Sequence, residues 1–519
     1  MKRLNTLAAR SALALALGLA ATPPAGAQVL QERLDLGALA KIREEGLSRS
    51  RVDTLAQELL DGIGSRLTGS TGMRRAQDWA SATFKAWGLS NVAIEPWDSL
   101  FGRGWDRVSY SGRFLAPYEQ PLRAEPQAWS GSTKGTVTCD VIRMDIQDTT
   151  QLGQYSGKLK GACVMWQPWN PIEPEFNAAP RRHSNDSLLA WSTQKAEPAQ
   201  PGGGPNADQM ARFREAQART QAALRFVRKE KPSVFLVPSG WTYGLLRTGG
   251  HPDGRLARDS VYEPIPTLMV THEQYGQLTR LIQRGVTPRL EVNVQNKWTN
   301  PDRREFNVVA EIPGTDLKDE VVMIGGHFDS WHSGTGATDD GAGSLAMMEA
   351  LRILKTLDLP LRRTVRIALW SGEEQGLLGS RAYVRVHADE MAKISAYLNI
   401  DNGSGRLRGV WGQGNEEAVK VFDQILVPFR DLGVVASRLQ NTGGTDHLSF
   451  DRVGVPGFQF IQDPLEYGIR SHHSHVDTYE RLVIDDLKQA ATIVAWTVFT
   501  IANRDEMMPR KPVAPPSTN

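Results

Sequence analysis

Hydrophobic and polar residues form a repeating pattern in the C-terminal half of the chain, and this pattern predicts strands and helices in turn. Short apolar runs at residues 321–324, 364–370 and 394–400 predict buried strands. Residues 345–354 carry apolar side chains at helical spacing, and a longer amphipathic helix is expected after Asp485. Strands that alternate with helices predict an α/β fold, with a mixed, mostly parallel central sheet covered by helices on both faces.

The preceding part of the chain has a different pattern. Two helices are expected in residues 28–120, over RVDTLAQELLDGIG and MRRAQDWASATFKAWGL, and glycine closes both. Residues 121–296 contain short apolar runs between turn residues, which predicts a β-rich region. A Pro/Gly-rich stretch at residues 196–208 interrupts this region and leads into a charged helix. We therefore expect a β-rich unit inserted into an α/β unit that consists of residues 28–120 and 297–503.

The N-terminus has the pattern of a secretory signal peptide. A basic leader precedes the apolar run SALALALGLAA, and Ala25-Gly26-Ala27 supplies the small residues of a cleavage site. The apolar run is shorter than the roughly 20 residues that a membrane anchor needs. We therefore expect residues 1–27 to be removed and the protein to be exported, either to a periplasm or to the medium. At the other end, residues 504–519 are rich in Pro and basic residues and are expected to be disordered.

Length, composition and charge indicate a folded protein and give no sign of nucleic-acid binding. A chain of 519 residues is expected to form two or more folding units, and 40% apolar residues suffice for packed cores. The formal charge of +2 falls to about −1 without the leader, and basic residues gather into no patch that would indicate nucleic-acid binding. No stretch after the leader is long and apolar enough to predict a membrane span.

The chain has two cysteines, Cys139 and Cys163, each within a strand-like run. The sequence is compatible with a disulfide and with two buried free thiols. We favour the free thiols because nothing in the sequence places the two Cα atoms within bridging distance. Two cysteines cannot supply a thiolate zinc site. Any metal must therefore be held by histidine and carboxylate.

Residues that can bind metal follow three of the predicted strands. His327 comes directly after VVMIGG and Asp401 directly after AYLNI, while Glu373 and Glu374 follow TVRIALW. A glycine-rich loop after the first of these strands ends at Asp339. In α/β sheets, ligand sites gather at the carboxyl ends of the strands, so we expect these side chains to meet at one edge. Clustered carboxylates repel each other and need a cation, and imidazole and carboxylate suit zinc.

Four motifs, HFDSWHSGTGATDDGAG, SGEEQGLLGS, LNIDNG and HHSHVDT, resemble in this order the metal-binding motifs of the M28 family of co-catalytic zinc peptidases. The first and last are most similar to the branch of carboxypeptidase Q, also called plasma glutamate carboxypeptidase. The resemblance covers residues 28 to about 503. It implies the zinc exopeptidase fold, a protease-associated (PA) domain as the β-rich insertion, two Zn²⁺ per chain and peptide-bond hydrolysis.

The resemblance also implies five metal ligands in this chain. Asp339 bridges both ions, His327 and Asp401 complete one site, and Glu374 and His473 complete the other. His473 is chosen among the histidines of HHSHVDT because the family's ligand precedes the acidic residue of the motif by four positions.

The same resemblance implies that Glu373 is the general base and acid, and that Asp329 orients the ring of His327. A peptide bond needs a nucleophile, a stabilised oxyanion and a protonated leaving amine, and two metal ions that share one water serve the first two needs. Four further residues are candidates for substrate contacts: His472, His475, Tyr467 and Asp446.

Other enzyme classes have less support. Ser330 lacks the G-x-S-x-G setting of a serine hydrolase, and no H-E-x-x-H motif occurs. Two alternatives on the same fold stay open, namely a single-zinc acyl transferase of the glutaminyl cyclase type and a non-catalytic binding protein. For a peptidase, the expected partners are dipeptides or short peptides, and the recognised terminus and a homodimer are left open.

Overall fold

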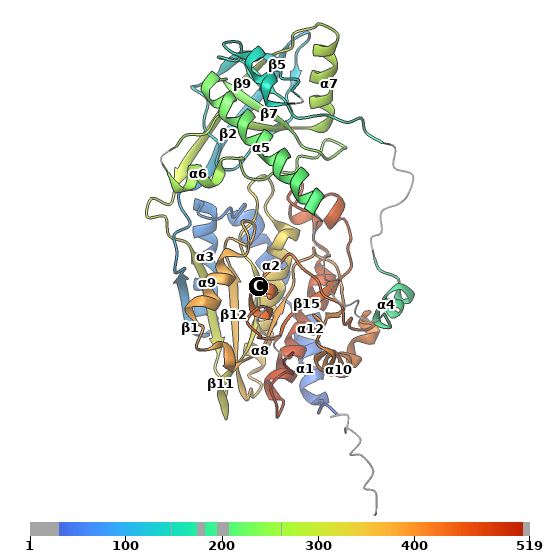
Figure 1. Cartoon of the computed structure of the whole chain (residues 1–519). Coiled ribbons are helices and arrows are strands. Elements are labelled where there is room, and N and C mark those ends of the chain that lie inside the picture. Colours follow the sequence, from blue (N-terminus) through green and yellow to red (C-terminus); the bar gives the residue numbers. More distant parts are fainter. Residues whose placement is uncertain (1–30, 147, 174–181, 195–206, 261, 512–519) are drawn as a thin grey trace, which may run out of the picture.

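The computed structural model describes residues 31–146, 148–173, 182–194, 207–260 and 262–511 (Figure 1). Two sheets divide the chain into an α/β unit and a β-rich unit, and Figure 1 shows the β-rich unit at the top. The predicted signal peptide lies outside the described residues. Within them, no helix has the length and apolar character that a membrane span requires.

The α/β unit is built on a seven-stranded sheet. Its strand order is β1 (Ser90–Pro96), β10 (Phe306–Ile312), β12 (Arg363–Trp370), β11 (Leu317–His327), β13 (Ile394–Asn399), β15 (Gly457–Gln462) and β14 (Leu407–Trp411). The four strands from β12 to β15 are parallel to one another, whereas β1, β10 and β14 pair antiparallel at the two sides. The prediction of a mixed sheet with a parallel centre is therefore confirmed.

Helices cover both faces of this sheet. One face packs against a large apolar core formed with α1 (Leu36–Ser48), α2 (Val52–Ala56), α3 (Thr71–Ala86), α8 (Ala342–Leu357), α10 (Glu416–Ile425) and α12 (Ile484–Asn503). The other face packs against α9 (Leu378–Val386) and α11 (His447–Asp451). The predicted helices at 345–354 and after Asp485 correspond to α8 and α12, which lie side by side in the core.

The β-rich unit contains an eight-stranded sheet. Its order is β3 (Gln120–Pro121), β2 (Gly104–Ala116), β9 (Arg289–Thr299), β5 (Val137–Arg143), β6 (Cys163–Met165), β7 (Val234–Pro238), β8 (Thr267–Val270) and β4 (Ala124–Pro126). Three helices belong to this region: α5 (Ala207–Glu230), α6 (Gly254–Asp259) and α7 (His272–Gln283). A fourth, α4 (Asn185–Ser192), lies against the α/β unit instead (Figure 1), where Arg408 donates to Asn185 Oδ1 at 2.6 Å.

The β-rich unit begins earlier in the chain than the sequence predicted. Strand β2 pairs along its length with β9, so by sheet membership this unit spans residues 104–299 rather than 121–296. The boundary was placed too late because β2 has mostly polar, half-exposed positions, with the burial typical of an outer strand. Its assignment depends on a partner almost 200 residues away, which local patterning does not report.

The preference for free thiols was wrong. Cys139 and Cys163 form a disulfide with a Cα–Cα distance of 5.4 Å. Strands β5 and β6 are parallel neighbours, with Val141 opposite Cys163, and this register brings Cys139 within reach. The bond crosslinks the centre of the β-rich sheet.

The prediction of disorder after residue 503 was also wrong for the described part of the tail. Met508 is buried, and its N–H donates to Ser395 Oγ at 2.9 Å. Arg510 donates to the carbonyl of Ile394 at 2.7 Å, and Lys511 pairs with Asp451 at 2.6 Å. These polar residues bind backbone and carboxylate groups of the α/β unit, which composition alone does not indicate. Residues 512–519 lie outside the described residues.

Candidate metal centre

Three parallel strands bring the predicted ligands to one edge of the sheet. β11 ends at His327, β12 ends just before the loop that holds Glu373 and Glu374, and β13 ends two residues before Asp401. Their parallel pairing places all three carboxyl ends on the same side. Asp339 lies in the short helical segment Ala337–Gly341 at the start of α8, beneath the same edge.

Local geometry in the loop after β11 explains its glycines. Gly336 has a φ of 62°, in the left-handed region, and a Cβ built there would lie 2.2 Å from the Cβ of Ser330. Only glycine fits this close approach between the two arms of the loop. The tight fold turns the chain back so that Asp339 faces His327.

The five predicted ligands form two groups that share Asp339. In the first group, His327 Nε2 lies 3.3 Å from Asp339 Oδ1 and 3.6 Å from Asp401 Oδ1. In the second, His473 Nε2 lies 3.2 Å from Asp339 Oδ2 and 2.9 Å from Glu374 Oε2. Asp339 thus presents one carboxylate oxygen to each group, which is the arrangement of a bridging ligand.

The donor atoms fit a cation. Asp339 Oδ2 and Glu374 Oε1 are buried and have no hydrogen-bond partner among the described residues. Within the described ranges, no Lys or Arg forms an ion pair with Asp339, Glu373, Glu374 or Asp401. Leaving buried carboxylate oxygens unpaired is costly, and a divalent metal would remove that cost. Imidazole nitrogen and carboxylate oxygen without thiolate are a donor set for zinc.

The pKa shifts show the same excess of negative charge. Burial raises the pKa of Glu373 and Glu374 well above the ordinary range, and the charges of Asp401 and Asp339, respectively, raise it further. Burial opposes protonation of His327, but the charges of Asp401 and Glu373 outweigh it and raise its pKa well above the usual value. Without a cation, this cluster holds more negative charge than its surroundings can stabilise.

Asp329 contacts both His327 and the loop that carries Glu373 and Glu374. The carbonyl of Asp329 lies 2.9 Å from His327 Nδ1, closer than its carboxylate at 3.6 Å, so the backbone rather than the side chain orients the ring. The carboxylate instead accepts hydrogen bonds from the N–H groups of Glu373 at 3.1 Å and Glu374 at 3.3 Å. It also accepts one from Thr68 Oγ1 at 2.9 Å. This side chain therefore fixes the loop that carries both glutamates.

Two supporting residues were missed by the sequence reasoning. Arg66 is fully buried and donates to the carbonyls of Phe328, Thr335 and Gly336, which holds both arms of the loop after β11. Thr68 binds Asp329, as described above. Both lie in GSRLTGSTG, just before the helix expected at MRRAQDWASATFKAWGL, and no role was predicted for either; Ser70 of this segment caps α3. The single available signal was this polar motif, whose partners are about 260 residues away.

Asp477 fixes the position of Asp339. Its carboxylate accepts hydrogen bonds from Thr338 N at 2.8 Å, Thr338 Oγ1 at 2.7 Å and Asp339 N at 3.2 Å. Burial raises the pKa of Asp477 to about 7, and the charge of Asp339 adds to this effect. The sequence reasoning used Asp477 only to locate His473, whereas it also links the HHSHVDT loop to the shared ligand.

The four candidates for substrate contacts lie in different places. His472 and Tyr467 line the pocket at the site, and Tyr467 Oη donates to Asp339 Oδ1 at 3.0 Å. Asp446 is fully buried and accepts a hydrogen bond from Ser380 Oγ at 2.5 Å, so it supports α9 from behind the pocket. His475 faces the β-rich unit, where its Nδ1 accepts from Leu246 N at 3.1 Å. Asp446 and His475 are thus placed as supporting groups rather than on the pocket surface.

An open pocket of about 600 Å³ leads to the two ligand groups. Asp339, Asp401, Glu374 and His473 line one part of it, and Glu373 lies beside them with its side chain 11% exposed. Residues of α9, of α11 and of the loop before α11 form the remaining wall. A ligand in this pocket would therefore contact the two groups and Glu373 together.

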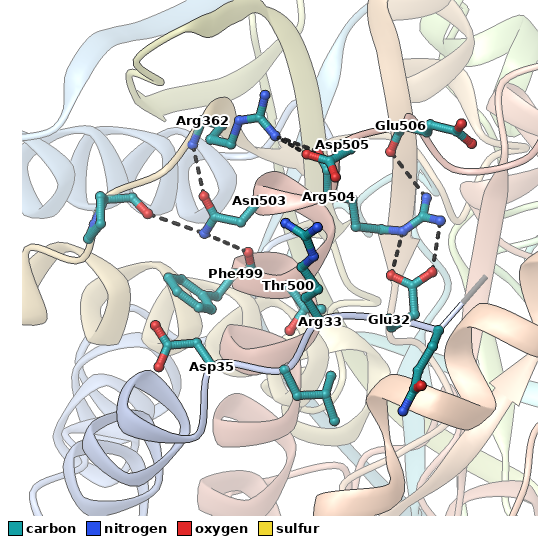
Figure 2. A pocket seen from close by; sticks show the side chains of 13 residues that line it. Glu32, Arg33, Asp35, Arg362, Phe499, Thr500, Asn503, Arg504, Asp505 and Glu506 are labelled. Carbon is teal, nitrogen blue, oxygen red and sulfur yellow. Dashed lines mark hydrogen bonds and ion pairs between the residues drawn. The ribbon is translucent and has the colours of Figure 1, made fainter.

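A second pocket, of about 730 Å³, lies where the N-terminal segment meets the end of α12 (Figure 2). Four of its charged side chains pair with one another. Arg504 binds both carboxylate oxygens of Glu32 at 2.8 Å, and Arg362 pairs with Asp505 at 2.8 Å. Its lining includes no histidine, so the larger volume does not indicate a second metal centre.

A pocket that exposes paired His and carboxylate groups at the edge of a mixed α/β sheet is a site that can hold metal ions. Residues 307–498 match the family model described as "Peptidase family M28", so the part of the chain that carries the ligand groups is that of a metallopeptidase of this family. The resemblance drawn from the four motifs is thereby confirmed. The donor set described above fits zinc, which is the metal that the family implies.

Relatives and solved structures agree with this assignment. Carboxypeptidase Q of Pongo abelii is 28% identical over 458 residues, which are 87% of this chain and 85% of that protein. A crystal structure of a peptidase M28 precursor from Shewanella amazonensis SB2B has a TM-score of 0.65 at 23% identity and covers 92% of this chain and 98% of that one. BSAP, a zinc aminopeptidase from Bacillus subtilis, has a TM-score of 0.56 at 15% identity and covers 88% and 97%. The two structures support the fold.

Proposed function

We propose that the chain is an exported, zinc-dependent exopeptidase that uses two metal ions to hydrolyse dipeptides or short peptides. The observation that supports this most strongly is the position of Asp339. One of its carboxylate oxygens lies within 3.3 Å of His327 and the other within 3.2 Å of His473. A protein with a single metal would have no need for a shared carboxylate between two donor groups.

In this proposal, His327, Asp339 and Asp401 hold one zinc ion, and Glu374, Asp339 and His473 hold the other. Zinc at these positions would polarise the scissile carbonyl and lower the pKa of an attacking water. The protein residues fix the donors beforehand, through the strand ends, the carboxylate of Asp477 and the backbone carbonyl of Asp329.

Glu373 is the proposed general base and acid. It lines the pocket beside the first group, with Oε2 3.9 Å from His327 Nε2, and its backbone N–H is held by Asp329. Glu374 turns toward His473, whereas Glu373 keeps its carboxylate free for proton transfer. It would take a proton from the attacking water and give it to the leaving nitrogen.

A glutamate-to-glutamine exchange tests this division of roles. Glu373→Gln keeps the size of the side chain but removes its basicity, so we expect kcat to fall about 10²–10⁴-fold. Zinc content, measured by mass spectrometry of the purified protein, should stay at the wild-type value. Glu374→Gln is the matched control, because it should lower the zinc content as well. If Glu373→Gln lost zinc together with activity, the assignment of these two residues would be wrong.

The names of the relatives support a peptide substrate, and they include both a carboxypeptidase and a zinc aminopeptidase. A panel of free dipeptides, N-blocked dipeptides and aminoacyl nitroanilides would identify the recognised terminus. Cleavage of N-blocked substrates alone would indicate a carboxypeptidase, and cleavage of free-amine substrates alone an amino- or dipeptidase. A single zinc ion per chain, without peptidase activity, would instead favour the acyl transferase.

Three further proposals concern the domain type, the export and the oligomeric state of the protein. The β-rich unit is proposed to be a PA-like domain, because the motif resemblance implies an inserted domain of this kind. Export is proposed from the leader, and N-terminal sequencing of the secreted protein should give Gln28 as its first residue. A homodimer is the simplest assembly to test, by light scattering of the purified protein.

A further inference from the structure

Two arginines on the pocket wall have no acidic partner among the residues that the structure describes. Arg381 lies in the first turn of α9, and Arg452 follows directly after α11. Both line the pocket that leads to the ligand groups. Among the described residues, neither guanidinium forms an ion pair or a hydrogen bond, and Arg381 Nε is buried without a partner.

The carboxylates of α11 and of the residue just before it, Asp451 and Asp446, already have partners. Asp446 accepts a hydrogen bond from Ser380 Oγ at 2.5 Å, and Asp451 pairs with Lys511. On the same helix, Arg385 pairs with Asp98 at 2.6 Å, which is the usual state of an arginine at a protein surface. A buried guanidinium N–H without an acceptor costs free energy, so Arg381 is prepared for a partner that comes from outside the chain.

We infer that Arg381, assisted by Arg452 at the rim of the pocket, binds a carboxylate group of the peptide substrate. The planar fork of arginine matches a carboxylate in a bidentate geometry. Leu377 and Leu448 line the same wall and would contact the aliphatic part of the bound residue. This inference rests on the proposed function and adds a substrate class to it.

The connection to Glu373 indicates which part of the substrate is bound. The N–H of Leu377 donates to the carbonyl of Glu373 at 2.9 Å, and the N–H of Arg381 donates to the carbonyl of Leu377 at 3.1 Å. The proposed proton donor and Arg381 thus lie on successive turns of one segment. Because Glu373 protonates the leaving nitrogen, the carboxylate belongs to the residue that leaves. It is either the C-terminal α-carboxylate of that residue or an acidic side chain on it.

Substrates with and without each carboxylate distinguish the two sources. The zinc-loaded wild-type protein and its Arg381→Gln variant are assayed on Ala-Ala, Ala-Ala-amide and Ala-Glu-amide. If the α-carboxylate is bound, kcat/KM of the variant on Ala-Ala falls about 10- to 100-fold, mainly through KM, and the amides are unaffected. If an acidic side chain is bound, the loss appears with Ala-Glu-amide instead. Arg385→Gln is the matched control and should change none of these values.

Binding without turnover makes the inference independent of catalysis. Calorimetric titration with a dipeptide analogue that has a CH₂–NH group in place of the peptide bond should show binding weakened about 10- to 100-fold in Arg381→Gln. Arg452→Gln, at an exposed position, should weaken it only about threefold. A wild-type protein that cleaves no peptide refutes the proposed function. Equal effects of Arg381→Gln on all substrates, or no effect on either cleavage or binding, refute the inference about this arginine.

Discussion

The two ligand groups that meet at Asp339 are built in different ways. His327 and Asp401 follow directly from parallel strands, and their side chains are 1% and 7% exposed. His473 comes from a loop, has a φ of 60° and is 23% exposed. The positions of His327 and Asp401 therefore depend on the sheet, whereas the position of His473 depends on contacts that hold a loop in place.

The β-rich unit supplies several of these contacts. The N–H of Thr248 donates to the carbonyl of His473 at 2.8 Å, and the N–H of His475 donates to the carbonyl of Leu246 at 3.0 Å. Thr248 Oγ1 also lies 2.5 Å from Ser333 Oγ in the loop after β11. One half of the metal centre therefore forms within the α/β unit, and the other half is completed where the two units meet.

The largest effect is expected at the residue common to both groups. Asp339→Ala removes a carboxylate oxygen from each group, so the zinc content should fall to almost none. We expect kcat/KM to fall by more than about 10³-fold, because the loss of even one electrostatic donor costs 10²–10³. The measurement is zinc analysis together with peptidase assays, and a variant that keeps one full equivalent of zinc would contradict a shared ligand.

The second-largest effect is expected for the two histidines, one from each group. His327→Ala and His473→Ala should each reduce the zinc content by one ion and lower kcat/KM about 10²–10³-fold. The ion held by the unaltered group should remain, since the two groups share only Asp339. Loss of both ions from His473→Ala alone would show that the sheet-built group does not stand on its own.

A tenfold smaller effect is expected for Asp329, which contacts the ring of His327 and the N–H groups of Glu373 and Glu374. Asp329→Asn keeps one acceptor oxygen for the N–H groups of Glu373 and Glu374 but removes the charge. Such supporting groups typically contribute about 10–100-fold to activity or metal affinity. We expect that loss in kcat, with wild-type zinc content at saturating metal. Thr68→Val, which removes the third hydrogen bond, should have a weaker effect in the same direction.

The weakest effect at the metal centre is expected in the contact between the units. Thr248→Val removes the hydroxyl group, which meets Ser333 and donates to the His473 carbonyl at 3.3 Å, but keeps the N–H group that binds the same carbonyl. A net hydrogen bond contributes about 1 kcal/mol, so zinc affinity of the His473 group should fall about fivefold. Competition with a chelator measures this, and Thr248→Ser serves as the control that retains the hydroxyl group. A matching loss at the His327 group would remove the distinction between the two halves.

The disulfide should leave the metal centre unchanged. Cys139→Ser with Cys163→Ser removes a crosslink from the sheet of the β-rich unit, which lowers the free energy of unfolding by about 2–4 kcal/mol. Thermal denaturation measures the change, with zinc content as the readout at the site. A loss of zinc at room temperature would show that the site depends on the whole β-rich unit more than its few contacts suggest.

The sequence predicted those parts of the site that depend on neighbours along the chain. His327, Glu374 and Asp401 follow strands whose apolar runs are evident, so their convergence could be inferred from the rule for parallel sheets. The roles of Asp339 and His473 were predicted from the motif resemblance, and in the structure the two side chains lie next to each other. Their roles as ligands stay a prediction until a metal is measured.

Contacts between distant backbone groups could not be predicted. Leu246 and the N–H group of Thr248 bind the HHSHVDT loop through their own main-chain atoms, which leave no mark in the side-chain pattern. The roles of Arg66 and Thr68 were not predicted, because polar residues before a helix are also typical of a cap and the partners of these two lie about 260 residues away. The β2 boundary and the disulfide were misjudged for the same reason, since both depend on which strands lie side by side.

The most direct test is a crystal structure of the zinc-loaded protein with anomalous data collected at the zinc edge. We expect two anomalous peaks that flank Asp339, one contacted by His327 and Asp401 and the other by His473 and Glu374. A single peak, or zinc bound away from Asp339, would contradict it.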